Sequence, residues 1–144
     1  MYGELMFQTS FRISSQSEGD IIDITPQVKK VVQDSKVHEG IVHLFVQHST
    51  AALTTIEFEP GVLSDLRRAL SVLAPNNADY AYNARWGDGN GRSHVKAALV
   101  GPALTIPVKG GILMCGTWQQ IVLIECDVNA GRERTIVCTV MGNE

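Results

Sequence analysis

The sequence lacks three features that would each indicate a definite class of protein. It has no apolar run near the roughly 20 residues that a membrane-spanning helix needs. It has no basic block that would follow a nucleic-acid backbone, and its formal net charge is −3. Its first residues, MYGELMFQTSFRIS, lack the cationic and apolar segments of a signal peptide. We therefore expect a cytoplasmic protein with no nucleic-acid partner and no membrane partner.

Cysteine is scarce, and no two cysteines form a CxxC pair. The three present are Cys115, Cys126 and Cys138, each within an apolar stretch that is typical of a strand. A reactive thiol needs an electropositive and partly exposed site. These contexts do not offer one, so we expect buried, reduced thiols.

The remaining composition is that of a globular protein. The chain has 144 residues, of which 44% are hydrophobic and 19% are charged, values that do not indicate disorder. The length suits one folded unit with its own core. With no internal repeat, low-complexity tract or linker, the sequence predicts a single compact α+β domain over residues 1–144.

Hydrophobic periodicity predicts about seven strands and three helices. The strand expected over about 41–48 has apolar residues on both faces, so we expect it to be central and buried on both sides. The expected elements are a strand over 5–13, a short strand and then a helix opened by Pro26, strands over 41–48 and 52–58, a helix opened by Pro60, a polar loop over 76–92, a short helix over 94–100, and a strand-rich remainder.

The stretch WGDGNGRSH, Trp86–His94, is the first candidate site. Its glycines allow positive φ and close approach of a ligand to backbone N–H groups. Ser93 is expected to cap the following helix, whose N-terminus favours anions. The stretch matches neither the dinucleotide fingerprint nor the P-loop. The pattern predicts an anion site, for phosphate or pyrophosphate, built from Gly89, Asn90, Gly91, Arg92, Ser93 and Lys96.

Asp88 lies within the same stretch and would repel a bare anion. A divalent metal ion held by Asp88 and by phosphate oxygens would reconcile the two charges. A flexible glycine loop with a capping serine and a solvated arginine accounts for the same residues about equally well. Both interpretations stay open at this point.

A second candidate cluster lies in VHLFVQHSTAALTTIEFE. His48 ends the expected strand just before a polar turn, where its side chain can reach a cleft. His43 lies in mid-strand and is expected to be a hydrogen-bonded core residue. Glu57 lies near the end of the next strand; a buried carboxylate there must be paired, metal-bound or neutralised, whereas an exposed one needs no partner.

Three segments resemble the signature segments of the YjbQ-like family, a family described as secondary thiamine-phosphate synthases. They are HSTAALTTIE, WGDGNGRSHVKAALVGPALTIPV and GTWQQIVLIECD. The resemblance extends along nearly the whole chain. It implies a single α+β domain with a β-rich, sandwich-like sheet body and about three helices, usually assembled as a homotrimer.

The resemblance also implies site residues. By position these are the catalytic residues His48, Glu57, Asp88 and His94, of which His48, Asp88 and His94 would hold a divalent metal, Mg²⁺ or Zn²⁺. Close relatives with the same glycine loop often have histidine where this chain has Arg92. That difference disfavours a tight zinc site and favours an oxyanion site.

The leading functional hypothesis is synthesis of thiamine phosphate. A pyrimidine-methyl diphosphate and a thiazole phosphate would give thiamine phosphate and pyrophosphate, with the cationic groups stabilising the departing pyrophosphate. Two alternatives stay open: a trimeric protein that binds a metal or a phosphorylated metabolite without turnover, and a metal-dependent phosphate-ester hydrolase. The expected partner is a small phosphorylated substrate.

Overall fold

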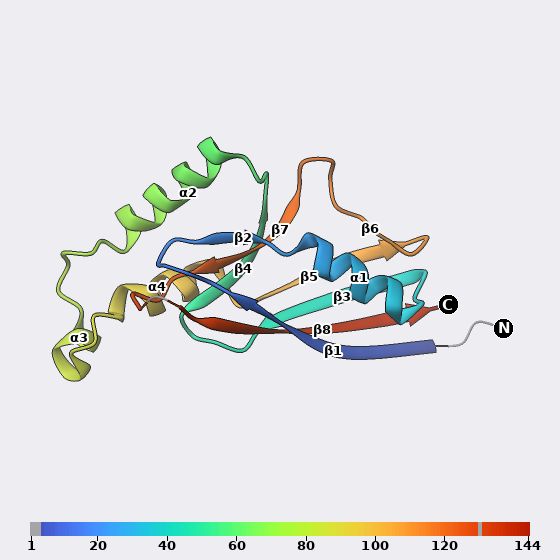
Figure 1. Ribbon diagram of the computed structural model, residues 1–144, viewed down its shortest axis with the longest axis horizontal. Helices are drawn as coiled ribbons and strands as arrows, with labels where there is room; N and C mark the ends of the chain where they lie inside the picture. The colour runs from blue at the N-terminus through green and yellow to red at the C-terminus, as the bar shows by residue number, and fades with distance from the viewer. Residues whose placement is uncertain (1–3, 130) are drawn as a thin grey trace.

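Two antiparallel sheets form the body of the protein in the computed structural model, which describes residues 4–129 and 131–144 (Figure 1). The larger sheet has the strand order β1-β8-β3-β5-β6 and the smaller one β2-β7-β4. The strands are β1 (Glu4–Ser14), β2 (Ile21–Asp23), β3 (Glu39–Val46), β4 (Ala51–Ile56), β5 (Ala103–Lys109), β6 (Ile112–Leu113), β7 (Gln120–Glu125) and β8 (Glu133–Asn143).

The helices pack around the sheets in places that their apolar residues determine. They are α1 (Thr25–Ser35), α2 (Pro60–Leu73), α3 (Ala81–Trp86) and α4 (Gly91–Val100). Val28, Val31 and Val32 form an apolar stripe along α1 and are buried in the core, so α1 packs on the sheets. Helix α2 buries Leu63 and Leu70 and extends away from the large sheet (Figure 1).

The α+β architecture agrees with the prediction, but the element counts differ. Residues 4–129 and 131–144 contain four helices and eight strands, where the sequence predicted about three and about seven. The additional helix, α3, lies inside the expected loop over 76–92. It was missed because none of its six residues is buried, so it carries no apolar stripe that a pattern could reveal.

Strand β3 is the middle strand of the large sheet, yet only one of its faces is buried within a single chain. Val42, Leu44 and Val46 point into the core between the sheets. On the other face Ile41 and Phe45 are 40% and 43% exposed. The expectation that β3 is buried on both faces is therefore wrong for the isolated chain. An apolar pattern indicates that a face is suited to burial, but it does not show whether the same chain or another molecule covers that face.

The three thiols are free, as predicted. Cys126 and Cys138 are buried as expected, whereas the expectation of burial is wrong for Cys115, which lies after the short strand β6 and is half-buried. Burial raises the pKa of Cys126 and of Cys138 to about 12, so neither is a thiolate near neutral pH. Among the helices of the described residues, none combines the length and the apolar character needed to cross a bilayer.

Candidate functional site

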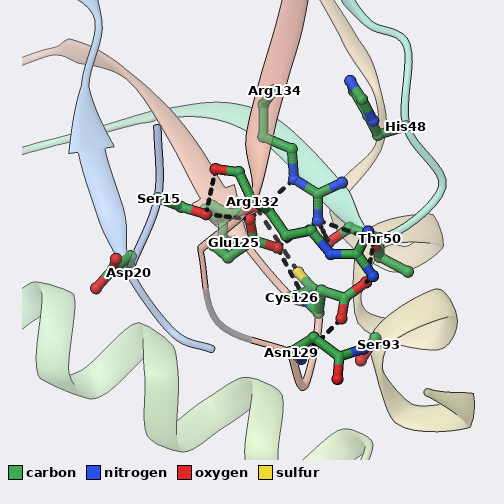
Figure 2. A network of polar contacts seen from close by, with 12 residues as sticks. Ser15, Asp20, His48, Thr50, Ser93, Glu125, Cys126, Asn129, Arg132 and Arg134 are labelled. Atoms are coloured by element: carbon green, nitrogen blue, oxygen red, sulfur yellow. Dashed lines mark hydrogen bonds and ion pairs between the residues drawn. The ribbon is translucent and has the colours of Figure 1, made fainter. Parts of the chain in front are cut away.

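A buried ion pair between Glu125 and Arg134 forms the centre of the polar network in Figure 2. Arg134 Nε donates to Glu125 Oε1 at 2.8 Å, and a second guanidinium nitrogen contacts the other carboxylate oxygen. That second nitrogen also donates to the backbone oxygen of Thr50 at 3.1 Å and to its hydroxyl at 2.9 Å. The Ser15 hydroxyl donates to Glu125 Oε1. The pair thus joins the ends of β1 and β7 to the start of β8 and the turn before β4.

Asn90 connects the glycine loop to this network. Its amide oxygen accepts bonds from the Ser93 hydroxyl at 2.8 Å and from the Val128 N–H at 3.0 Å. Its amide nitrogen donates to Asp127 Oδ1 at 3.3 Å, while Thr50 donates to Asp127 Oδ2 at 3.0 Å. We call Asn90, Ser93, Asp127 and Val128 the Asn90 lock. It fixes the start of α4 to the turn that follows β7.

Asp127 is charged within this lock. Burial alone would raise the pKa of its carboxyl group, but hydrogen bonds from the Asn129 N–H and the Thr50 hydroxyl, with the charge of Arg132, hold that pKa below its usual range. Arg132 lies 3.1 Å from Asp127 Oδ2. The acceptor that orients Asn90 is therefore an ionised carboxylate, and charge-assisted bonds of this kind are the stronger ones.

The predicted capping role of Ser93 is wrong. Helix α4 begins at Gly91, with Asn90 at the N-cap position, and the Ser93 hydroxyl donates to Asn90 rather than accepting a backbone bond. Gly91 is required by packing, since an added Cβ would lie 2.6 Å from Tyr80 Cβ. Gly89 has a φ of +74°, which favours glycine. The loop is thus anchored by the packing at Gly91 and by the hydrogen bonds of Asn90.

Asp88 and His94 lie on one side of the loop, connected by a residue that the sequence did not indicate. Tyr82, on α3, donates to Asp88 Oδ2 at 3.3 Å. Its ring packs on the His94 ring, with the centroids 4.7 Å apart. The other carboxylate oxygen of Asp88 accepts the Asn90 N–H at 3.1 Å. No sequence signal pointed to Tyr82, because its helix has no periodic pattern.

Arg92 and Lys96 both contact Glu18, a residue outside the glycine loop. Arg92 forms a bidentate pair with Glu18, with both nitrogen–oxygen distances at 2.8 Å, and Lys96 Nζ lies 3.6 Å from the same carboxylate. The hydrogen bond from Arg92 holds the pKa of Glu18 below its usual range despite partial burial. An anion at the glycine loop would have to compete with Glu18 for Arg92. Glu18 itself had no sequence signal within SSQSEGD.

His48 is held as a neutral imidazole. Its Nε2 accepts the Thr135 N–H at 3.0 Å, so the ring proton resides on Nδ1. Desolvation, followed by the charge of Arg134, lowers the pKa of His48. His43, expected in the core, is instead half-buried, and its Nδ1 lies 2.9 Å from Thr105 Oγ1.

Glu57 does not join His48 within one chain. It is exposed directly after β4, whereas His48 precedes that strand. Six strand residues span about 20 Å, at roughly 3.3 Å each. The two candidates therefore lie beyond opposite ends of β4.

The predicted metal ligands do not form a ligand group within a single chain. Among the described residues, no three His, Cys, Asp or Glu side chains are close enough together to hold a metal ion. His48 Nε2 and both oxygens of Asp88 already accept hydrogen bonds. As the structure places them, His48, Asp88 and His94 do not fit a metal site, and bound Mg²⁺ or Zn²⁺ stays a prediction.

The two-sheet α+β fold is that of a known class of protein. A family model described as "UPF0047 protein YjbQ-like" matches residues 9–143. The chain therefore belongs to the YjbQ-like family, as its sequence indicated. It is 38% identical to a UPF0047 protein of Methanothermobacter thermautotrophicus, over 96% of this chain and 90% of the relative. It is 30% identical to the YjbQ protein of Escherichia coli O157:H7, over 96% and 99%.

Solved structures show the same fold. A YbjQ-like protein of unknown function from Sulfolobus solfataricus has a TM-score of 0.89 and 30% identity, covering 97% of this chain and 99% of that protein. A hypothetical protein from Aeropyrum pernix has a TM-score of 0.85 and 28% identity, covering 94% and 98%. The likeness extends along both chains, so the single α+β domain is shared.

We predict that Arg134→Met lowers the free energy of unfolding by about 3–5 kcal/mol, because it leaves Glu125 buried without its counter-ion. The double variant Arg134→Met with Glu125→Gln should lose less. Arg68→Met is the matched control, since Arg68 forms an exposed pair with Asp65, and such pairs contribute about 0–1 kcal/mol. Urea unfolding measures all three. Equal losses for Arg134→Met and Arg68→Met would contradict the prediction.

We also predict that His48 titrates below 6.5 and carries its proton on Nδ1. With the folded pKa lowered, the unfolded chain binds the proton more readily. The stability due to neutral His48 is thus present above about 6.5 and lost as pH falls through the folded pKa. Long-range ¹⁵N NMR reports both the midpoint and the tautomer, and His48→Gln assigns the signal. His38→Gln should leave the midpoint unchanged; a midpoint at or above 6.5 would refute this.

Proposed function

We propose that the protein is a transferase acting on small phosphorylated substrates, and specifically that it forms thiamine phosphate. In this reaction the bond between the pyrimidine methylene carbon and its diphosphate oxygen breaks, and pyrophosphate leaves with the electron pair. The thiazole nitrogen forms the new carbon–nitrogen bond. The activation barrier is lowered mainly by stabilising the departing anion while the methylene carbon bears positive charge.

The observation that carries the proposal is the set of hydrogen bonds that anchors the glycine loop to the turn after β7. The Asn90 lock and the contact between Tyr82 and His94 hold a half-exposed imidazole beside the start of α4. A group held in advance stabilises a leaving anion without reorganising during the reaction. A ring N–H of His94 would donate to a pyrophosphate oxygen as negative charge develops. His48 Nδ1–H is a second donor of the kind the reaction needs.

The other predicted residues have more limited parts in this proposal. Arg92 would act on the departing anion only through its positive charge at a distance, because its hydrogen bonds go to Glu18. Glu57 would contribute only across a subunit contact. Mg²⁺ belongs in the assay since it accompanies pyrophosphate compounds in solution, but none of the residue roles above depends on it. A cytoplasmic location stays part of the proposal.

We predict that the wild-type protein, given both precursors and Mg²⁺, forms thiamine phosphate and that His94→Ala lowers the rate by about 100-fold, the usual order for loss of one proton donor. Fluorescence after oxidation to the thiochrome measures the product. His38→Ala, an exposed histidine away from the loop, is the matched control. Circular dichroism verifies the fold of each variant.

The alternatives give different results in the same assay. Tight binding of the precursors without product would favour the non-turnover binding protein. Release of phosphate from a precursor without coupling would favour the hydrolase. Product formed equally by wild type and His94→Ala would remove the loop from the reaction.

Assembly into a homotrimer is part of the proposal, and the outer face of the large sheet supports self-association. The strand register pairs Met6 and Ile41 with Met141 on neighbouring strands, and Ile41 with Pro107 on the next. Paired residues point to the same side of a sheet. These four form an apolar row across β1, β8, β3 and β5, with Met6 70% and Met141 48% exposed. Such a surface usually marks an interface.

We predict that light scattering on the purified protein gives three times the chain mass of 15.7 kDa. Met141→Lys should shift the mass toward that of one chain, because it places a charge in the centre of the apolar row. Ser64→Lys, at an exposed position on α2, is the control and should stay assembled. A monomeric wild type would contradict the assembly.

A further inference from the structure

A cavity of about 240 Å³ lies between α2, α4, the end of β7 and residues 18–21. Its inner wall includes Lys96, which is only 7% exposed, together with Ile124 and Cys126. Arg67 and Asn76, both exposed, lie at its mouth. Its volume is below the roughly 300–1,000 Å³ that drug-sized ligands occupy. The cavity therefore suits one small group.

The charges around this cavity are predominantly positive. Lys96 and Arg67 line it, and the two carboxylates that also line it, Glu18 and Glu125, are each already paired with an arginine. Arg92 hydrogen-bonds both carboxylate oxygens of Glu18, so the charge of Lys96 is additional to a pair that is already complete. With Arg92 and Arg134, which pair with these carboxylates but do not line the cavity, four cationic groups surround two carboxylates. A cavity with low-dielectric walls strengthens the attraction of such an excess for an anion.

Arg67 is oriented but not neutralised. Its Nε donates to the backbone oxygen of Gly19 at 2.6 Å, which fixes the plane of the guanidinium. No hydrogen bond or ion pair to a described residue engages its two terminal nitrogens. An oriented guanidinium fork with free donors matches the geometry of a phosphate group.

We propose that this cavity binds a phosphate group, with Lys96 and Arg67 as its charged ligands and Asn76 and Ser71 beside its mouth. Glu18 positions the Lys96 ammonium group. The site is distinct from the one around His94. Residues two apart on a helix point about 200° apart, so Lys96 and His94 lie on opposite sides of α4. The proposal does not depend on the transferase reaction.

Isothermal titration calorimetry with inorganic phosphate at low ionic strength tests the site. We expect the wild-type protein to bind phosphate, and Arg67→Gln and Lys96→Met each to weaken binding about 10-fold or more, because each removes a charge-assisted hydrogen bond. Arg68→Gln is the matched control: it removes the neighbouring charge on α2, whose partner is Asp65, and should bind like wild type.

Three results would overturn the proposal. They are no phosphate binding by the wild type, the same affinity in Arg67→Gln as in Arg68→Gln, and tighter binding of malonate than of phosphate, which would assign the cavity to carboxylates. Arg67 is exposed, so its variant stays informative if Lys96→Met fails to fold. Loss of phosphate binding in Arg67→Gln with thiamine phosphate formation unchanged would separate this site from the proposed reaction.

Discussion

The ion pair between Glu125 and Arg134 is the interaction on which the polar end of the molecule depends. Burying two charges costs several kcal/mol per ion, and only near-complete hydrogen bonding offsets that cost. Here the carboxylate also receives the Ser15 hydroxyl and the Asp127 N–H, and the guanidinium reaches Thr50. Four chain segments converge on one pair, so its geometry specifies how the two sheets meet at this end.

The glycine loop takes its position from the same network. Asn90 donates to Asp127. Asp127 is connected to Glu125 through its own N–H and to Arg134 through the Thr50 hydroxyl. A buried amide with its donor and its acceptor satisfied has few alternative positions. The glycines of the loop therefore provide backbone shape and close packing, while the asparagine among them provides the attachment.

Much of the fold could be predicted from the sequence, because Val28, Val31, Val32 and the alternating strands follow the periods of their elements. Helix α3 could not, since it buries nothing. The site was predicted in part: His94 and Asp88 do lie together. Two contacts could not be foreseen, because only the fold brings the partners together. Tyr82, which connects Asp88 and His94, lies 12 positions before His94, and Glu18, the partner of Arg92, lies 74 positions before it.

Helix α4 separates two polar environments, and its position at the Asn90 lock explains why it buries so many polar groups. Ser93 and Lys96 are buried beside apolar Ala97, an arrangement that costs free energy unless each polar group is bonded. Ser93 fixes the rotation of the helix through Asn90, and that rotation directs Lys96 toward Glu18 and His94 toward Tyr82. The bonds of Asn90 to Asp127 and to the Val128 N–H anchor this turn of the helix to the turn after β7 and so orient both of its sides. The buried polar residues of α4 therefore orient the helix, and the two proposed sites lie on opposite sides of it.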